Sequence, residues 1–404
     1  MTAAAAPLRV CLVAGEVSGD RLGAALMRVL RARTGGAVVF SGVGGSDMAA
    51  EGLASPFPLG DLAVIGFLSI PARLRTILRR IREAADAVIA AQPDILVIID
   101  SPEFTHRVAK RVRARAPDIP IVDYVSPSVW AWRPWRARAM RRFVDRVLAL
   151  LPFEPDVHAR LGGPPCVYVG HPIADRVGAL RPDAAEAQRR DAAPPLILVM
   201  PGSRSGELTR MLPVFARTIE AVRARFGPLD VVVPAVPHLK ERVAAEVAAW
   251  PVPARVVSDA AEKDAAFRVA RAALAKSGTG TLELAVAGVP TVAAYQVPLI
   301  EELVARLLVQ VPSFILANLV LGERVVPEFV QRDCTPERLA EALLALLRDG
   351  PERQAQLAAF ARLDTVMEIG TASPAEQAAN AVLDMVERRR GAIKSPVAPA
   401  PSTA

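Results

Sequence analysis

The polar side chains Glu16, Ser18 and Asp20 follow an apolar run at residues 10–14 and precede a run with helical spacing from about Arg21. In a parallel sheet, such a turn lies beyond the carboxyl end of a strand, where ligands bind. Ser18 and Asp20 are residue types that commonly cap helices, so capping is an open alternative for both. Glu16 lies too early to cap a helix from Arg21. We therefore expect this group at the lip of a ligand cleft.

A second carboxylate, Asp100, ends the apolar run 95–99 and stands two residues before Pro102. A carboxylate at the end of a central strand is placed to accept a proton from a ligand in the cleft. The alternative is an aspartate that is merely solvated at a strand end. We favour the role as a proton acceptor, because Glu16 is expected at the same cleft.

A turn in the second half has the residue types of an anion site. Gly202, Ser203 and Arg204 follow an apolar run and precede a helix expected from about Glu207. Backbone N–H groups at a helix start, with an arginine beside them, suit a phosphate or diphosphate. The chain has no Asp-x-Asp motif, so we expect neither a metal bridge to a diphosphate nor any other metal site.

A further turn combines small hydroxyl residues with glycine at the start of another expected helix. Its members are Ser277, Gly278, Thr279 and Thr281. Such residues can hold phosphate, and Glu283 in the first helical turn can accept the two hydroxyls of a ribose. A capping box between Glu283 and Gly280 or Thr279 is the alternative.

These side chains must be positioned by β-sheets, and the sequence predicts two. Apolar runs of strand length alternate with helical runs in both halves, which is typical of parallel sheets with crossover helices. The rhythm restarts after residues 178–194, which are rich in Ala, Pro and charge and which we interpret as a linker. We expect an α/β protein with two doubly wound, Rossmann-like domains facing a cleft. They are residues 1–178 and residues 179–385, whose last helix can return to the first domain, followed by a disordered tail at 386–404.

Composition and charge exclude several classes of protein. At 404 residues and 52% hydrophobic content, the chain can bury two ordinary cores. Its apolar runs are far shorter than the roughly 20 residues of a membrane span, and residues 1–9 lack the apolar run of a signal peptide, so we expect a cytoplasmic protein. Three widely spaced cysteines indicate no disulfide framework. The net charge of +7 lies in residues 1–178, but no nucleic-acid-binding motif accompanies it, so no nucleic-acid partner is expected.

The glycines of residues 42–52 bring to mind a dinucleotide-binding turn. The pattern Gly-x-Gly-x-x-Gly from Gly42 would, however, require glycine where Asp47 stands. We therefore expect no nicotinamide cofactor, although the glycines still allow a polar ligand to approach the backbone closely.

Residues 66–82 have the make-up of a helix that lies on an anionic membrane, with apolar residues at helical spacing among five arginines. The apolar residues expected to contact the membrane are Phe67, Leu68, Leu74, Ile77 and Leu78. An ordinary surface helix that packs the same stripe on a sheet is the alternative. We favour the membrane, because the basic excess is confined to this half of the chain.

Several longer motifs lie between about residues 8 and 385, including GEVSGDRLGA, YVSPSVWAWR, VLALLPFEP, YVGHP, SGTGTLE and NLVLGERVVPEFVQ. Together they resemble the lipid-A-disaccharide synthase family, inverting glycosyltransferases of the two-domain GT-B fold. The resemblance implies transfer of diacylglucosamine from UDP-2,3-diacylglucosamine to 2,3-diacylglucosamine 1-phosphate (lipid X). The products would be the β-1,6-linked lipid A disaccharide 1-phosphate and UDP, and no cofactor is implied. The family also suggests a homodimer, and the acyl chains imply a peripheral position on the inner face of the inner membrane.

The resemblance also implies roles for single residues. Asp100, in the family's ID-x-P motif, would be the general base, with Glu16 left open as the alternative. Arg204 of the PGSR motif and Asn318 before LVLG would belong to the donor site. Glu283 would hold the ribose of uridine, as in related GT-B enzymes.

On the acceptor side, the resemblance implies Ser18 and Asp20 beside Glu16. The chain departs from the family pattern at Ser69, Ser205 and Gln296. These departures bear on acyl-chain and phosphate contacts and leave the residues of the reaction intact.

Two other functions remain open from the sequence. A sugar-nucleotide epimerase shares the two-domain architecture, but the basic and apolar segment 66–82 argues against it. A non-catalytic lipid-binding module is the other, and a complete nucleotide-binding second domain argues against that.

Overall fold

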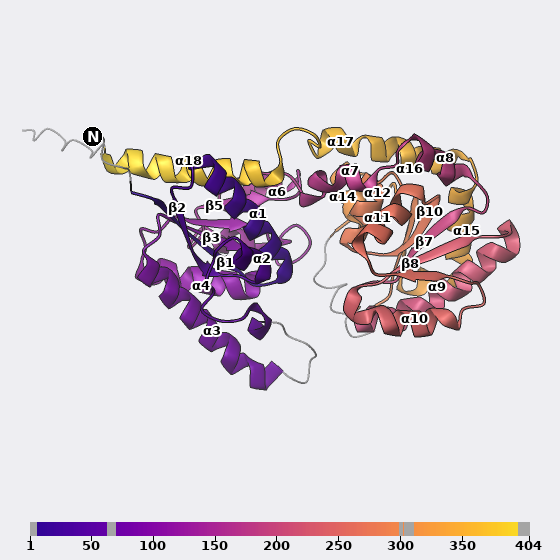
Figure 1. The fold of residues 1–404 in the computed structure, drawn as a ribbon, viewed down its shortest axis with the longest axis horizontal. Coiled ribbons are helices and arrows are strands. Elements are labelled where there is room, and N and C mark those ends of the chain that lie inside the picture. The colour runs from indigo at the N-terminus through magenta and orange to yellow at the C-terminus, as the bar shows by residue number, and fades with distance from the viewer. Residues whose placement is uncertain (1–5, 63–69, 299–301, 303–310, 395–404) are drawn as a thin grey trace, which may run out of the picture. The chain divides into compact units, whose positions relative to one another are not determined.

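The computed structural model describes residues 6–62, 70–298, 302 and 311–394. The chain divides into two compact units, Met1–Pro172 with Ala372–Ala404 and Ile173–Thr371 (Figure 1). Each unit contains one six-stranded sheet with helices on both faces, and all neighbouring strands run parallel. The expectation of two doubly wound α/β domains is confirmed.

The sheet of the first unit has the strand order β2-β1-β3-β4-β5-β6. Its strands are β1 (Leu8–Ala14), β2 (Val38–Val43), β3 (Ile95–Ile99), β4 (Ile121–Tyr124), β5 (Arg146–Ala149) and β6 (Cys166–Tyr168). The order reverses between β1 and β3, so the crossovers on either side of this pair leave in opposite directions. Beyond the carboxyl ends of such a pair lies the place where doubly wound sheets bind ligands.

Helices cover both faces of this sheet. They are α1 (Val17–Arg33), α2 (Ser46–Ala50), α3 (Ile70–Ala91), α4 (Pro102–Arg115), α5 (Trp135–Met140), α6 (Glu154–Arg160) and α18 (Pro374–Lys394). Successive residues of β3 point to opposite faces, so Val97 packs with α1 and α18 while Ile98 packs with α3 and α4. The strand β3 is therefore apolar throughout, as expected for a strand buried on both faces.

The second sheet has the order β12-β11-β10-β7-β8-β9 and reverses between β7 and β10. Its strands are β7 (Leu196–Met200), β8 (Asp230–Pro234), β9 (Arg255–Val257), β10 (Ala272–Lys276), β11 (Thr291–Tyr295) and β12 (Glu328–Val330). The turns after β7 and β10 carry the two anion-site motifs of the sequence. The fold thus brings together residues that lie about seventy positions apart along the chain.

The longer helices of the second unit are α9 (Ser205–Phe226), α10 (Lys240–Ala248), α11 (Ala260–Val269), α12 (Thr279–Val286), α15 (Pro336–Leu347) and α16 (Pro351–Ala361). Shorter ones are α7 (Val177–Leu180), α8 (Ala184–Asp191), α14 (Leu316–Leu321) and α17 (Leu363–Val366). One core cluster joins β7, β8 and β10 to α9, α10 and α15.

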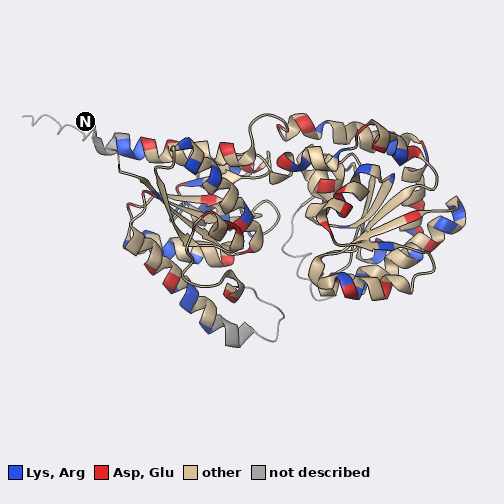
Figure 2. Cartoon of the chain, viewed as in Figure 1, with Lys and Arg blue, Asp and Glu red and all other residues tan. Residues whose placement is uncertain are grey.

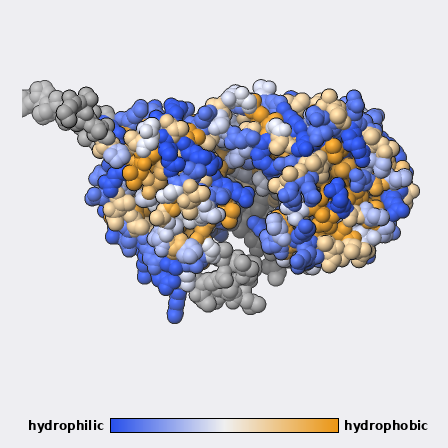
Figure 3. All heavy atoms as spheres, in the orientation of Figure 1, coloured by the Kyte–Doolittle hydropathy of each residue, from blue (hydrophilic) through white to orange (hydrophobic). Residues whose placement is uncertain are grey.

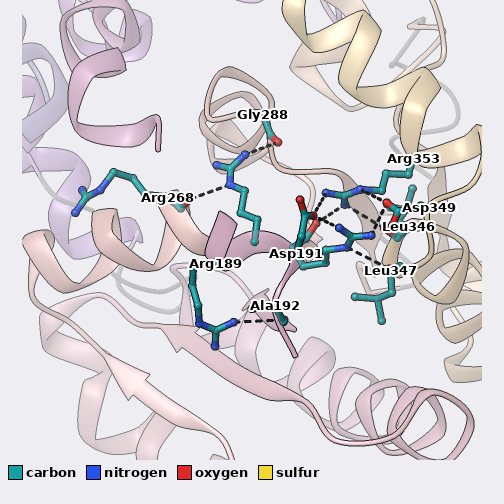
Figure 4. A network of polar contacts seen from close by, with 11 residues as sticks. Arg189, Asp191, Ala192, Arg268, Gly288, Leu346, Leu347, Asp349 and Arg353 are labelled. Carbon is teal, nitrogen blue, oxygen red and sulfur yellow. Dashed lines mark hydrogen bonds and ion pairs between the residues drawn. The ribbon is translucent and has the colours of Figure 1, made fainter. Parts of the chain in front are cut away.

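Residues 178–194, interpreted from sequence as a linker, instead form the end of α7 and the whole of α8 inside the second unit. The side chain of Arg190 donates to backbone oxygens at the carboxyl ends of α11 and α12, including Gly288 at 3.0 Å. Asp191 belongs to a network with Arg271, Asp349 and Arg353 (Figure 4). The polar composition of this segment therefore reflects helix-end contacts.

The last helix packs on the first unit, where Val382 and its neighbours join the core beside α1 (Figure 1). The helix α18 runs to Lys394 and so passes residue 385, after which a disordered tail was expected. The helix α5 is short: it ends at Met140, and Arg146–Ala149 form β5.

Candidate functional site

Asp100 lies directly beyond β3, in a turn whose backbone is in a sparsely populated conformation. The φ angles of Asp100 and Ser101 are 54° and 47°, in the left-handed region that residues other than glycine rarely adopt. Such a conformation costs about 1–3 kcal/mol at each residue and persists where surrounding contacts enforce it. Here the N–H of Asp100 donates to the carbonyl oxygen of Tyr124, and the hydroxyl of Thr105 donates to that of Asp100.

The Asp100 carboxylate is held in one orientation. Its Oδ2 accepts a hydrogen bond from Ser18 Oγ at 2.8 Å, and its Oδ1 accepts one from the backbone N–H of Ser101 at 2.7 Å. Ser18 comes from the first turn of α1, which begins at Val17, four residues before the predicted start at Arg21. The structure therefore joins two of the residues predicted from sequence, one after β1 and one after β3.

Gly15 allows these two turns to meet. A Cβ on Gly15 would lie 2.4 Å from Cβ of Ser101, which is far inside van der Waals contact. Any larger residue would push the start of α1 away from the end of β3 and break the bond between Ser18 and Asp100.

A cavity of about 630 Å³ opens beside this pair within the first unit. Its lining is more apolar than polar and comes from the start of α1, residues 59–62, α3 and the first turns of α4. Among the lining residues are Glu16, Ser18, Ile77, Glu103 and Phe104. Glu16 is exposed and occupies the N-cap position of α1, but its side chain makes no capping hydrogen bond.

Asp20 has a different position from the one expected. It is 2% exposed, and its carboxylate accepts hydrogen bonds from the backbone N–H groups of Gly45, Asp47 and Met48 at 2.7–3.1 Å. These groups belong to the start of α2, so Asp20 caps that helix from a distance in sequence. We do not retain Asp20 among the proposed acceptor contacts, because its carboxylate oxygens are already engaged.

The second unit has a cavity of about 480 Å³ at its own switch point, beyond β7 and β10. The residues that line it include seven that the sequence analysis assigned to the donor site: Gly202, Ser203, Arg204, Ser277, Gly278, Thr279 and Glu283. The N-termini of α9 and α12 both border it. The positive ends of the two helix dipoles, together with basic side chains, make this cavity suited to an anion.

Glu207 shapes the turn before α9. Its carboxylate accepts the backbone N–H groups of Ser203 and Arg204 at 3.0 and 3.2 Å and pairs with Lys276 Nζ at 2.8 Å. These partners outweigh burial and lower the pKa of Glu207. Gly202 has a φ of 122°, and a Cβ there would lie 2.4 Å from a carboxylate oxygen of Glu207. The arrangement leaves the Arg204 side chain 83% exposed at the rim of the cavity.

Glu283, predicted to bind ribose, is held by two cations in this structure. Its Oε1 accepts a hydrogen bond from Arg176 at 2.6 Å, and its Oε2 accepts one from Lys263 at 2.8 Å. Arg176 also binds Asp264 at 2.6 Å, so the carboxylate of Glu283 is fixed in orientation. Each carboxylate oxygen can accept a further hydrogen bond, so room for a hydroxyl partner remains.

Two predicted donor residues lie outside the lining of this cavity. Thr281 is fully buried, and its hydroxyl donates to the carbonyl oxygen of Gly278 at 2.7 Å, so it shapes the turn. Asn318 is 3% exposed and binds backbone groups of Val325 and Val326. The amide of Asn318 thereby closes the loop after α14, and it also donates to Ser313 Oγ at 3.2 Å.

Lys276 and Lys263 line the second cavity but were not predicted from the sequence. Lys276 ends the strand β10, whose other residues are small and apolar, and its Nζ lies 4.6 Å from the centroid of the Tyr295 ring. The strand-end argument that selected Asp100 would have selected Lys276. Lys263 gives no such signal, because it lies within α11 and reaches the cavity through its long side chain.

The segment expected to contact a membrane is partly described. Phe67 and Leu68 lie outside the described residues, as does the side chain of Leu74. Ile77 does not face outward as predicted: it is half-buried against the core beneath α3 and lines the first cavity. Leu78 is exposed, about 100° around the helix from Ile77. The described part of α3 therefore packs its apolar stripe on the sheet, which is the alternative left open from the sequence.

The charged residues of α3 are also partly paired. Arg80 binds Asp61 and Glu83, both at 2.5 Å, and acidic and basic residues are seen along this helix in Figure 2. On the face drawn in Figure 3, hydrophobic residues of the described chain lie in small groups between hydrophilic ones. No helix in the described part of the chain is long and apolar enough to cross a membrane. Within the same residues, no group of His, Cys, Asp and Glu side chains is arranged to hold a metal ion.

A family model and individual relatives both match this chain over almost its entire length, and both point to the same family. Residues 10–382 match the model of the family described as lipid-A-disaccharide synthetase. A protein of Nitrobacter hamburgensis named lipid-A-disaccharide synthase is 60% identical over 390 residues, covering 96% of this chain and 98% of the relative. One of the same name from Rhodopseudomonas palustris strain HaA2 is 54% identical over 380 residues, covering 94% and 97%.

Solved structures with similar folds have low sequence identity. A putative UDP-N-acetylglucosamine 2-epimerase from Listeria monocytogenes gives a TM-score of 0.60 at 14% identity, covering 97% of this chain and 98% of its own. MurG from Acinetobacter baumannii gives 0.53 at 17% identity, covering 95% and 100%. At this identity the likeness concerns the fold alone, which is the two-domain GT-B arrangement.

Proposed function

The chain belongs to the lipid-A-disaccharide synthase family, and from that premise we propose how its residues carry out the reaction. The enzyme is an inverting glycosyltransferase. It transfers 2,3-diacylglucosamine from UDP-2,3-diacylglucosamine to 2,3-diacylglucosamine 1-phosphate and releases UDP. The observation that carries this assignment is the family match over residues 10–382, which includes both strand-end sites.

We assign donor binding to the cavity of the second unit. The N-termini of α9 and α12, with Arg204 and Lys276, supply donors and positive charge for a diphosphate. Glu283 would accept hydroxyls of the uridine ribose, in an orientation set by Arg176 and Lys263. These groups would also stabilise the negative charge that UDP gains as it leaves, which lowers the barrier to transfer.

We assign proton removal to Asp100 in the first unit. The acceptor hydroxyl is a weak nucleophile until a base takes its proton, and inversion requires it to attack the sugar carbon opposite the departing UDP. The hydrogen bonds from Ser18 and Ser101 fix the orientation of the Asp100 carboxylate. Glu16, exposed at the same edge of the sheet, is the alternative base.

Incubating the protein with UDP-diacylglucosamine, with and without the monophosphate acceptor, tests the assignment. We expect a disaccharide only when both are present. An epimerase would convert the nucleotide sugar alone, and a lipid-binding module would give no product. Either of those results would overturn the proposed reaction.

The acyl chains of both substrates lead us to place the enzyme on an anionic membrane surface, at the inner face of the inner membrane. Trp132 and Trp135 are 37% and 62% exposed, and the guanidinium groups of Arg133 and Arg136 lie over the Trp132 ring. Exposed tryptophans beside arginines are typical of contacts with an anionic lipid surface. Changing both tryptophans to serine should reduce sedimentation with anionic vesicles, and unchanged sedimentation of the folded variant would contradict this surface.

The family also leads us to propose a homodimer. Light scattering of the purified protein over a range of concentrations tests this. A mass of twice 43.0 kDa is expected, and a mass that stays at the monomer value would contradict the proposal.

A further inference from the structure

Glu154 is a buried carboxylate in the first unit that the proposed reaction does not use. It is the first residue of α6, directly beyond β5, and is 3% exposed. Its Oε1 accepts the indole N–H of Trp130 at 3.1 Å, and its Oε2 accepts the backbone N–H of Leu151 at 3.0 Å. Both carboxylate oxygens are therefore used, one of them by a side chain from the segment between β4 and α5.

A second contact with that segment runs through Ser126. Its hydroxyl lies 2.9 Å from His158 Nε2 and donates a hydrogen bond to the carbonyl oxygen of Pro127 at 3.1 Å. Burial lowers the pKa of His158 to about 4, so the imidazole is neutral at physiological pH. If His158 donates from Nε2 to Ser126, only an acceptor, the Nδ1 lone pair, stays without a partner among the described atoms. The order His158, Ser126, Pro127 therefore leaves no N–H of the imidazole unpaired.

The ionised form of Glu154 lowers the stability of the folded protein instead of adding to it. Burial raises the pKa of Glu154 from 4.5 to about 7, so the charged form is disfavoured in the folded protein. A buried charge is weak evidence for stabilisation, because desolvation opposes the gain from its partners. A cost of this kind is typical of residues that hold a functional part of the molecule in place.

The segment that Glu154 contacts, residues 126–136, reaches the first cavity at its other end. Arg133 and Arg136 both bind Glu103, a residue in the first turn of α4 that lines the cavity. Asp100 lies only three residues before Glu103. The segment is thus fixed to α6 at one end and to the wall of the acceptor-side cavity at the other.

The geometry points to a positioning role: we propose that Glu154, through Trp130, holds residues 126–136 against the acceptor-side cavity beside Asp100. This inference rests on the proposed reaction, in which that cavity takes the acceptor. Glu154 touches neither substrate in this assignment. It acts through the segment it holds.

The charge of Glu154 matters for the hold, because an ionised carboxylate accepts the hydrogen bonds from Trp130 and Leu151 more strongly than a protonated carboxyl group does. The described titratable groups that face it are His158 on the same helix and the thiol of Cys166 on β6. Burial and the charge of Glu154 both raise the pKa of Cys166, and the thiol is neutral. The acceptor KM of the wild type should therefore rise as pH falls through about 7.

The experiment compares Glu154→Gln, Trp130→Phe and a control, Arg146→Met. The control removes the ion pair of Arg146 with Asp384 at the other end of β5, which perturbs the same unit far from the segment. For each folded variant, KM and kcat are measured for donor and acceptor separately across pH. Trypsin cleavage after Arg136 and Arg138 is followed in the absence of substrates.

We expect Glu154→Gln to lower kcat/KM for the acceptor about ten- to a hundredfold, since misplaced contacts cost rates of this order. The donor KM should change less than about threefold, the pH dependence near 7 should vanish, and cleavage should accelerate. Trp130→Phe should act in the same direction, and the two changes should not add, because they break one contact. Arg146→Met should show none of these effects.

Wild-type acceptor kinetics in Glu154→Gln, or an equal loss in Arg146→Met, would overturn the positioning role. Unchanged trypsin cleavage in Glu154→Gln would overturn it as well. If the wild type makes no disaccharide, the proposed reaction fails, and the cleavage comparison still decides whether Glu154 holds the segment.

Discussion

Replacing Glu154 with glutamine should change how the free energy of unfolding depends on pH. Burial raises the pKa of this carboxyl from 4.5 to about 7, while in the unfolded chain it is hydrated and titrates near its ordinary value. Because the folded-state pKa is the higher one, the group adds stability that is fully present below about 4.5 and is lost as pH rises through about 7. Glutamine does not ionise, so the variant lacks this dependence.

The size of the effect follows from the two pKa values. At about 1.36 kcal/mol per unit, the change from 4.5 to about 7 corresponds to about 3 kcal/mol. Most of this change falls between about pH 5 and about pH 8.5. Hydrogen bonds that glutamine cannot reproduce shift stability equally at both pH values. We therefore expect the variant, relative to wild type, to gain about 2 to 3 kcal/mol on going from the lower to the higher pH.

Urea unfolding followed by tryptophan fluorescence measures this difference. A Trp250→Phe background leaves three tryptophans, all in the first unit, so the signal reports on the unit that contains Glu154. Asp156→Asn is the matched control, because it removes an exposed carboxyl from the same helix. Its stability should differ from wild type by a constant amount. A difference for Glu154→Gln that stays constant within about 0.5 kcal/mol would refute the reasoning from burial.

Three further outcomes are expected. Arg204→Ala removes a charge-assisted contact worth about 1.5–3 kcal/mol, so UDP should bind about ten- to a hundredfold more weakly by calorimetry, and unaltered affinity would move the diphosphate site elsewhere. Lys276→Met should also weaken UDP binding and should raise the pKa of Glu207, because that carboxyl loses its cationic partner; a fully retained affinity would exclude Lys276 from the site. Ser18→Ala should lower turnover about tenfold without changing UDP affinity, since it releases one oxygen of Asp100, whereas a change in the acceptor KM alone would indicate a binding role.

The residues at the switch points could be predicted because their signal is local. Asp100 follows an apolar run directly and Arg204 lies in the turn after one, and parallel sheets bring strand ends of this kind together. The bond between Ser18 and Asp100 was not predicted, because it depends on how closely α1 approaches β3 at Gly15. The target of Asp20 was missed for the same reason: it caps a helix that starts twenty-six residues later.

The spacing of apolar residues along the sequence does not predict contacts made by long polar side chains. Residues 178–194 have no apolar pattern, but their arginines bind the ends of helices in the second unit. Ser126 and His158 lie thirty-two positions apart and meet only because β4 and β5 are neighbours. The strands β5, β6 and β12 have three or four residues, which is too short for an alternating pattern to separate them from loops.

The central claim is that Asp100 accepts the proton of the acceptor hydroxyl during transfer. The change Asp100→Asn keeps the size of the side chain and the bond from Ser18 but largely removes basicity, and loss of a general base costs about a hundred- to ten-thousandfold in rate. Turnover of UDP-diacylglucosamine with its acceptor should fall by this factor, while UDP affinity and the thermal midpoint stay close to wild type. A folded variant that retains more than about a tenth of wild-type turnover, measured where chemistry limits the rate, would contradict the claim and shift the assignment to Glu16.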